Sequence, residues 1–311
     1  MSDAQHSDVL VRRADALAGG FSDGELARMV RRGELLRLQR GAYLPADPGV
    51  PNSAAERHRI VIAATVRGLK VPGVVSHASA AVLHGLPLWK VPVSRVHLIR
   101  RPPAGGSGSN RVHLHVTQLP DESVTLVEGM AVTDLTRTVV DLARTTPFEC
   151  AVVAADAALA SRGTTRSRLI GCLRDMGPGP GTRRASRVVA FADGRSESVG
   201  ESRSRVLMQR LGLPVPQLQL TVRRPDGSLV GRSDFGWPDT RTLGEFDGRV
   251  KYGRLLRPGQ QPGDAVFEEK RREDELRDCG WEVARWTWPD LDKPWRVGDR
   301  LQRAFRRGGR R

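Results

Sequence analysis

Five charged side chains in the C-terminal third have the types and spacing of a metal-dependent phosphodiester-cleaving site. Glu201 falls in a stretch with helical character, Asp234 lies late in a predicted strand, and Glu245 and Asp247 share one face of the next strand. Lys251 follows them. Carboxylate oxygens suit Mg²⁺, which stabilises charge on a phosphate and activates a water that a nearby Lys can orient. We therefore assign all five as candidate catalytic residues, with Asp234 and Glu245 as the ligands of Mg²⁺.

Local patterns predict the elements that must position these residues. A helix containing Glu201 ends at Gly212, and a later charged helix that starts near residue 267 ends before Gly280. Between them we expect a hairpin of strands 217–223 and 229–236 and a third strand over 242–252. A last strand carries Val283 and Trp286. The order of helix, strands, helix and strand predicts an α/β domain over residues 191–295.

This stretch resembles the PD-(D/E)XK superfamily, in particular its very-short-patch-repair-like branch. Residues that match the helix Glu, the strand Asp, E-x-D-G and the closing helix and strand are Glu201, Asp234, Glu245, Asp247, Gly248, Arg271, Glu273, Asp274, Leu276, Gly280, Val283 and Arg285. Lys251 stands where those relatives usually have His. The resemblance implies a restriction-endonuclease-like fold and DNA cleavage with Mg²⁺. Because Lys is no neutral base near pH 7 unless its pKa is depressed, a non-catalytic fold used for binding or assembly stays an alternative.

The N-terminal segment, residues 1–50, has the layout of a winged helix-turn-helix. A first helix is expected over 8–18, and Ser22 with Glu25 forms a capping box at the start of a second one. Gly33 ends this helix, and a hairpin that turns at Arg40-Gly41 follows. A helix fits the DNA major groove, and arginines on the hairpin reach the flanking phosphates. The candidate DNA-binding residues are Arg28, Arg31, Arg32, Arg37 and Arg40.

The run FSDGELARMVRRGELLRLQRGAYLP (21–45) resembles the N-terminal winged domain of AbiEi-type antitoxins of type IV toxin–antitoxin systems. VVSHASAAVLHGLPL (74–88) is similar to the opening of the middle domain in actinobacterial members, and the resemblance continues through 132–143 and 152–163. It implies binding to double-stranded DNA, autorepression of an operon and a cognate toxin protein as partner. A protein that only binds a toxin through its middle domain is the third alternative.

The middle segment, residues 51–176, is predicted to be architectural. Ser53 caps one helix and Ser76 another across 77–84, while Arg137 and Asp141 form a surface pair on a later helix. His97, His113 and His115 fall on two predicted strands, and His77 and His84 fall on a helix. Zinc requires three or four convergent ligands, and no Cys or carboxylate here completes a recognisable pattern. We therefore expect ordinary strand and helix histidines.

The net charge of +15, from 50 basic and 35 acidic residues, is concentrated in two stretches. Residues 162–187 and 296–311 each hold seven Arg and one Asp, and we interpret 177–190 as a basic Gly/Pro linker and 296–311 as a basic tail. No apolar run predicts a membrane span or a secretory signal, and the three cysteines form no paired motif. We expect a cytoplasmic α/β multidomain protein that contacts no membrane.

Overall fold

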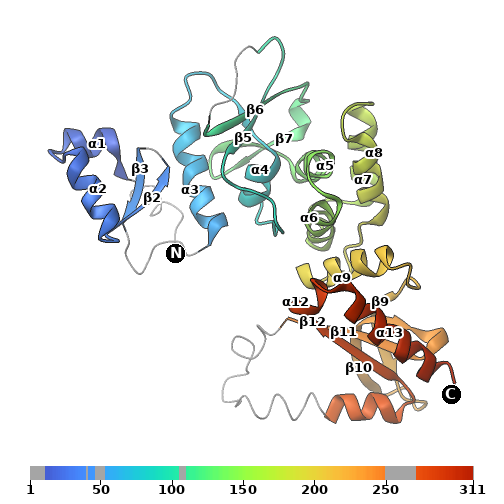
Figure 1. Cartoon of the computed structure of the whole chain (residues 1–311). Coiled ribbons are helices and arrows are strands. Elements are labelled where there is room, and N and C mark those ends of the chain that lie inside the picture. The colour runs from blue at the N-terminus through green and yellow to red at the C-terminus, as the bar shows by residue number, and fades with distance from the viewer. Residues whose placement is uncertain (1–10, 40, 46–52, 105–109, 249–270, 311) are drawn as a thin grey trace. The chain divides into compact units, whose positions relative to one another are not determined.

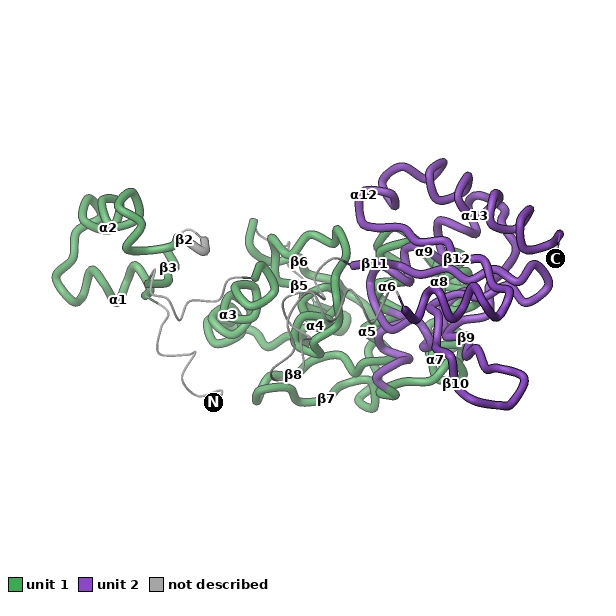
Figure 2. Tube along the Cα trace, turned by 90° about the horizontal axis from the view of Figure 1, so that it is seen from below, with its two compact units in different colours: residues 1–154, 162–190 green, residues 155–161, 191–311 purple. Residues whose placement is uncertain are grey.

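The computed structural model describes residues 11–39, 41–45, 53–104, 110–248 and 271–310. The protein is a mixed α/β chain that divides into two compact units (Figures 1 and 2). Unit 1 contains the chain up to residue 154 together with 162–190, and unit 2 contains 155–161 and 191–311. Among the described helices, none is both long and apolar enough to cross a membrane.

The first part of unit 1 is a small helix-and-hairpin fold. Its elements are β1 (Val11–Arg12), α1 (Arg13–Ala18), α2 (Asp23–Arg31), β2 (Leu35–Gln39) and β3 (Ala42–Pro45). The strands form an antiparallel sheet in the order β1-β3-β2. The capping box of Ser22 and Glu25 is confirmed, and Gly33 adopts the left-handed conformation (φ 73°) just after α2. The first helix is shorter than predicted because Val11 pairs with Tyr43 as a strand residue.

The rest of unit 1 surrounds a five-stranded mixed sheet in the order β6-β5-β4-β8-β7. Its elements are α3 (Ala54–Arg67), β4 (Val74–Val75), α4 (His77–Leu83), β5 (Val96–Arg100), β6 (Val112–Val116), β7 (Val124–Val127), β8 (Met130–Thr133), α5 (Leu135–Thr145), α6 (Phe148–Ala160), α7 (Arg166–Asp175) and α8 (Thr182–Phe191). Apolar side chains of α3, α4 and the central strands form one core.

Two expectations for this part of the chain are corrected. Ser76 stands at the start of α4, yet its hydroxyl makes no capping hydrogen bond and instead contacts the ring of His77. Arg137 and Asp141 do pair, but on the buried side of α5, with side chains only 2% and 4% exposed. A hydrophobic pattern cannot reveal either result, because both depend on which face of a helix the remaining elements cover.

The two basic stretches are helical rather than a linker and a tail. Most of 177–190 belongs to α8, which buries Ala185, Val188 and Val189. Residues 294–308 form α13 (Pro294–Gly308), which buries Val297 and Leu301 in the core of unit 2. Their arginines lie largely on the opposite, exposed faces, so a high arginine content concealed two amphipathic helices.

Unit 2 is a four-stranded sheet with helices on both faces (Figure 1). Its elements are α9 (Val199–Arg210), β9 (Gln217–Arg223), β10 (Leu229–Trp237), β11 (Thr242–Asp247), a helix over 271–278, β12 (Glu282–Thr287), α12 (Trp288–Leu291) and α13. The sheet order is β12-β11-β10-β9, and only β11 and β12 run parallel. The predicted strand 242–252 ends at Asp247, and residues 249–252 lie outside the described ones.

The two faces of this sheet pack against different helices. Aromatic side chains of β10, β11 and β12 pack with α9 and α13, whereas Leu276 packs on the other face with Val222 and Leu243. Gly200 permits the close approach of α9, because a Cβ there would lie 1.9 Å from the ring of Phe246. This contact fixes the start of α9, and with it Glu201, beside β11.

Candidate functional site

One face of α2 is basic and the opposite face is packed. Leu26, Met29 and Val30 lie in the small core with Ala16, Leu35 and Tyr43. These apolar residues occupy one side of the helix, so Arg28 and Arg31 lie on the other side, and both are exposed. The structure thus presents the two arginines, and Arg32 directly after them, on a surface that the core leaves uncovered.

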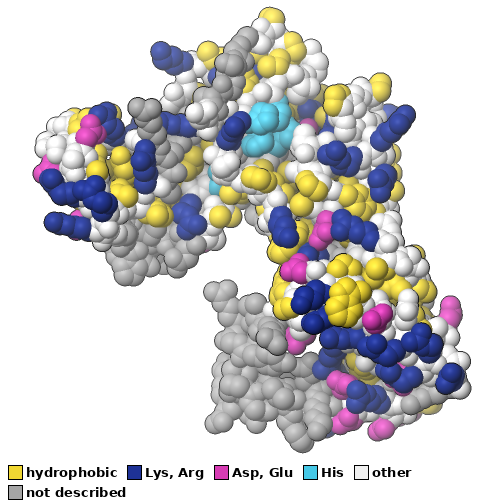
Figure 3. All heavy atoms as spheres, in the orientation of Figure 1, with side chains coloured by type: hydrophobic (Ala, Val, Ile, Leu, Met, Phe, Trp, Pro, Cys, Tyr) yellow, Lys and Arg dark blue, Asp and Glu magenta, His cyan; other side chains and the backbone are white. Residues whose placement is uncertain are grey.

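The acidic residues of this part are engaged with other partners. Asp23 accepts hydrogen bonds from Arg13, which lowers the pKa of the Asp23 carboxyl, and Glu25 is held by the cap of α2. Arg32 lies 3.8 Å from Glu34. Among the described residues, Arg28, Arg31 and the exposed Arg37 of β2 form no ion pair. Lys and Arg side chains recur over this part of the surface in Figure 3. Arg40 lies outside the described residues.

In unit 2, Asp234 and Glu245 come together on neighbouring strands. The antiparallel register pairs Phe235 with Gly244, which makes Asp234 and Glu245 the next residues on β10 and β11. One oxygen of Asp234 accepts a hydrogen bond from the backbone N–H of Phe246 at 2.8 Å. Asp247 lies at the end of the same strand and is half-buried, while Lys251 lies outside the described residues.

Two arginines neutralise the buried carboxylate of Glu245. Arg272 donates to one oxygen at 3.1 Å, and Arg285 of β12 donates to the other at 2.9 Å. The Glu245 side chain is only 10% exposed. Burial raises the pKa of Glu245 and the two guanidinium groups oppose that shift. Arg285 belongs to the pattern that the sequence identified, whereas Arg272 could be assigned to Glu245 only from the fold.

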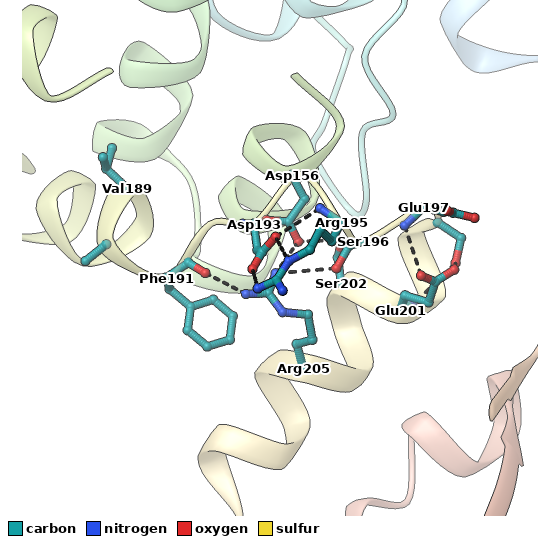
Figure 4. A network of polar contacts seen from close by, with 12 residues as sticks. Asp156, Val189, Phe191, Asp193, Arg195, Ser196, Glu197, Glu201, Ser202 and Arg205 are labelled. Atoms are coloured by element: carbon teal, nitrogen blue, oxygen red, sulfur yellow. Dashed lines mark hydrogen bonds and ion pairs between the residues drawn. The ribbon is translucent and has the colours of Figure 1, made fainter. Parts of the chain in front are cut away.

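Glu201 is buried but serves its own helix. Its oxygens accept hydrogen bonds from the Ser198 hydroxyl at 2.8 Å, from the backbone N–H of Glu197 at 2.9 Å and from the Gln219 side chain at 2.9 Å. Figure 4 shows Glu197 and Glu201 beside each other at the start of α9. The local reason is an N-cap at Ser198, which turns the carboxylate back onto the chain.

A polar network that the sequence did not suggest lies near the same helix (Figure 4). Asp156 is fully buried and accepts hydrogen bonds from Arg205 at 2.8 Å, from Ser202 at 2.7 Å and from the backbone N–H of Asp193 at 2.7 Å. Arg205 also donates to the carbonyl oxygen of Phe191 at 2.6 Å. Both oxygens of this buried carboxylate accept hydrogen bonds from the chain itself, so we interpret the network as structural.

Four histidines gather on one side of the sheet of unit 1. Parallel β5 and β6 place His97 opposite His113, and His115 follows two residues later on the same face. His77, the first residue of α4, stacks on His115 with ring centroids 3.7 Å apart and planes at 10°. The His97 Nδ1 and His115 Nε2 atoms are 3.0 Å apart. Figure 3 shows histidine side chains as a patch at the surface over β5 and β6.

The cluster is graded from buried to exposed. His77 is 5% exposed, His97 and His115 are half-buried, and His113 is exposed. Burial lowers the pKa of His97 to about 4 and that of His115 to about 3, and it lowers the pKa of His77 well below its usual range. Neighbouring imidazoles add to each shift. His84, which the sequence placed on the same helix as His77, follows the last residue of α4 and contacts the Thr133 carbonyl at 2.8 Å.

Within the part of the chain that the structure describes, three or more metal-binding side chains converge at one place, formed by His77, His97 and His115. Each offers one ligand atom, and these atoms all lie within 4.8 Å of one another. The expectation of ordinary strand and helix histidines stays a prediction, although the structure brings three of them together. The strand spacing signalled three of the four, whereas His77 is separated from them by a loop and could be placed only by the fold.

In comparisons with other proteins, the N-terminal part of the chain matches a described family. Residues 3–46 match the model of a family described as transcriptional regulator, AbiEi antitoxin. Over 280 residues the chain is 27% identical to the uncharacterized proteins MT2308 (strain CDC 1551) and Rv2248 (strain H37Rv) of Mycobacterium tuberculosis, covering 90% of this chain and 95% of each relative. A crystal structure of the Rv2827c protein from the same species is similar at 18% identity with a TM-score of 0.37, covering 70% of this chain and 84% of that one.

Proposed function

We propose that this chain is an antitoxin-like transcriptional regulator that binds double-stranded DNA through α2 and the hairpin of β2 and β3. The observation that carries the proposal is the division of α2 into a packed apolar face and an exposed face with Arg28 and Arg31. The family match of residues 3–46 supports the same assignment.

The shape of this part supports docking in a groove as a winged helix-turn-helix would dock. A major groove about 12 Å wide accepts one α-helix, so α2 can enter with its arginine face toward the bases. The exposed Arg37 on β2 lies on the hairpin that follows, where a wing reaches flanking phosphates. The proposal therefore assigns base contacts to α2 and phosphate contacts to the hairpin.

The test is binding of the full-length protein to the DNA upstream of its own gene, measured by fluorescence anisotropy with random-sequence DNA as competitor. We expect Arg31→Ala with Arg32→Ala to weaken specific binding at least tenfold, since each base-contacting arginine is worth about 1–3 kcal/mol. The logarithm of the binding constant should fall with the logarithm of salt by about 0.9 for each phosphate neutralised.

Arg67→Ala with Arg168→Ala is the matched control, because it removes the same charge from exposed positions on α3 and α7. The control should keep the preference for the upstream DNA over random DNA. If both double variants lose specific binding equally, the loss comes from the lower net charge of the protein. In that case α2 is not the element that recognises the DNA sequence.

The toxin partner belongs to the same proposal, because an antitoxin acts on a toxin protein. Co-expression with the neighbouring gene, where that gene encodes a nucleotidyltransferase-like protein, tests it directly. Co-elution of the two proteins at a fixed ratio supports an antitoxin role. Separate elution at micromolar concentrations of both contradicts it and leaves a regulator that acts on DNA alone.

For unit 2 we propose a role in binding or assembly rather than hydrolysis. The order of its elements and the adjacent Asp234 and Glu245 support a nuclease-like fold. As the side chains stand, however, they do not fit a magnesium centre. Both oxygens of Glu245 accept from arginines, and Asp234 accepts from a backbone N–H. A divalent cation needs these same oxygens.

The corresponding test is incubation of the full-length protein with supercoiled plasmid and Mg²⁺ or Mn²⁺. We expect wild type and Asp234→Ala to leave the plasmid equally intact. Nicking by wild type that Asp234→Ala abolishes would contradict the proposal and establish a metal-dependent endonuclease with Asp234 in its site.

A further inference from the structure

We propose that His77, His97 and His115 form a binding site in unit 1 for a divalent transition-metal ion, represented by Zn²⁺. The three side chains come from α4, β5 and β6, and one ligand atom of each lies within 4.8 Å of the other two. The site goes beyond the proposed DNA-binding function and does not depend on it.

The strand register and two hydrogen bonds made by the backbone of His97 bring the histidines together. The parallel register of β5 and β6 sets His97 diagonally across from His115 on one face. The backbone N–H of Ser76 donates to the carbonyl oxygen of His97 at 2.9 Å, which ties the start of α4 to β5. The backbone N–H of His97 donates in turn to the Ser79 hydroxyl of α4 at 2.9 Å. The convergence therefore follows from main-chain contacts and not only from flexible side chains.

The separations are close to those of a zinc site. Zinc bound to imidazole nitrogens at about 2.0–2.1 Å in a tetrahedron places the nitrogens about 3.3 Å apart. The nitrogens of His97 and His115 are already 3.0 Å apart. The ligand atom of His77 must approach them by at most about 1.5 Å. Its ring must also turn out of the parallel stack with His115, so that the in-plane lone pairs meet at one ion, and side-chain torsions allow this rotation.

The outer contact of His77 also matches a metal ligand. Its Nδ1 lies 3.0 Å from the Ser76 hydroxyl, so a hydrogen bond there leaves Nε2 to face the cluster. A metal-binding histidine ordinarily uses its second ring nitrogen in this way, which fixes the ring and its tautomer. His77 is held in the left-handed backbone region at φ 50°, a conformation that only a few per cent of non-glycine residues adopt.

The donor set selects the class of ion. Three imidazoles suit Zn²⁺ and its transition-metal neighbours, whereas Mg²⁺ and Ca²⁺ require oxygen ligands. Three protein ligands leave a fourth position for water. His113 stacks on His115 at 4.3 Å and covers the cluster from the solvent side.

The experiment uses untagged full-length protein, stripped with a chelator and titrated with ZnCl₂ by isothermal calorimetry. Replacement of Zn²⁺ by Co²⁺ adds a visible absorption band that reports on tetrahedral coordination. We expect one ion per chain. His97→Ala and His115→Ala should each weaken binding more than about 100-fold, since outer contacts alone are worth 10–100-fold. Ser76→Ala, which keeps all three ligands, should weaken it about 10-fold.

His84→Ala is the matched control and should stay within about threefold of wild type. His113→Ala uncovers the cluster but keeps all three ligands, so it should weaken binding much less than His115→Ala. His77 is left unchanged because of its backbone conformation, and circular dichroism verifies the fold of each variant. Wild-type affinity in both His97→Ala and His115→Ala would overturn the site and assign the bound ion to another part of the chain. A loss in His113→Ala or His84→Ala as large as in His115→Ala would overturn the three-histidine assignment.

Discussion

The carboxylates of unit 2 and the histidines of unit 1 both bring metal-binding side chains onto neighbouring strands, but they differ in what else surrounds them. Glu245 is buried and each of its oxygens accepts from an arginine. The histidines contact one another, and their burial favours the uncharged ring. Cationic donors occupy both oxygens of Glu245, whereas ring nitrogens of His97 and His115 contact each other and can turn toward a shared ion.

The difference has a physical origin in charge. A buried carboxylate that stays ionised must have counter-charges and hydrogen bonds, because removal from water is costly. A buried imidazole escapes this requirement by losing its proton. Residues of the right type at the right strand positions are therefore insufficient to predict a metal site. The availability of their lone pairs depends on neighbours that come from distant parts of the chain.

The largest effect is expected from removal of the two arginines that hold Glu245. In Arg272→Ala with Arg285→Ala the buried carboxylate loses both partners, and we expect a loss of about 3–5 kcal/mol in the free energy of unfolding. Urea denaturation of the full-length protein, followed by tryptophan fluorescence, measures it. Glu245→Gln added to the double variant should restore the part of the loss that comes from the unpaired charge of Glu245. The remainder belongs to Glu273, which also loses its ion pair with Arg285.

Arg224→Ala with Arg232→Ala is the control, since Arg232 pairs with Glu197 at an exposed position and Arg224 pairs with Glu275 at a half-buried one. Each such pair is worth about 0–1 kcal/mol. Equal stabilities of the two double variants would show that Glu245 does not depend on its arginines, and the contrast with the histidines would then lose its basis. If Mg²⁺ stabilises only Arg272→Ala with Arg285→Ala, the two arginines are what keeps a metal ion from Glu245, and the contrast with the histidines becomes stronger.

Unit 1 contains a buried carboxylate, Asp141, that is bonded to one arginine, whereas Glu245 is bonded to two. Asp141 accepts from Arg137 at 3.0 Å through one oxygen, and its other oxygen has no hydrogen-bond partner among the described residues. Burial raises the pKa of Asp141 to about 6, although Arg137 and Arg144 oppose the shift. Two guanidinium groups satisfy Glu245, whereas one leaves Asp141 partly unsatisfied.

This pKa predicts the sign of a pH effect. A raised pKa means that the folded chain holds the proton more tightly than the unfolded chain, so stability from protonation is complete below about pH 4 and is lost as the pH rises through 6. The difference in unfolding free energy between wild type and Asp141→Asn should fall by an amount on the order of 3 kcal/mol over this range. A difference that is constant between pH 4 and pH 7 would contradict the raised pKa.

Local signals in the sequence predicted much of the framework. The capping boxes of Ser22 with Glu25 and Ser53 with Glu56 are present, and the strands that carry Asp234 and Glu245 begin at the predicted residues. These features depend on residues within one or two turns, or on a period of two. Helices α8 and α13 escaped prediction because arginines and glycines in both stretches resemble a linker composition.

The relations between distant elements could not be predicted in the same way. Arg272 reaches Glu245 across 27 residues of sequence, and His77 reaches His115 across 38. Each contact depends on how a helix packs on a sheet, and that packing is the sum of many weak contacts. The exposure of the candidate DNA-binding arginines was easier to predict, because the spacing of Leu26, Met29 and Val30 already determines which side of α2 is exposed.

Metal ions should distinguish the two clusters by their effect on thermal unfolding. A ligand that binds only the folded chain stabilises it by about 2.7 kcal/mol at a concentration of 100 times Kd. We expect Zn²⁺ to raise the unfolding temperature of chelator-treated protein by several degrees, at roughly 2–4 °C per kcal/mol, and millimolar Mg²⁺ to leave it unchanged. His115→Ala should remove the effect of Zn²⁺. A rise with Mg²⁺ that Asp234→Ala abolishes would reverse the assignment of the two clusters.

The smallest effect concerns Glu201, whose carboxylate belongs to the unit 2 pattern but caps its own helix. If capping is its role, Ser198→Ala removes the hydroxyl that bonds the backbone N–H of Glu201 and destabilises the protein by about 1 kcal/mol. Glu201→Gln keeps oxygen and shape and should cost less than Glu201→Ala, because an amide oxygen still accepts from the backbone N–H of Glu197. Urea denaturation ranks the three variants. A larger loss in Glu201→Gln than in Ser198→Ala would mean that the charge of Glu201, rather than its cap, is what the fold requires, and Glu201 would then rejoin Asp234 and Glu245 as part of an ionic site.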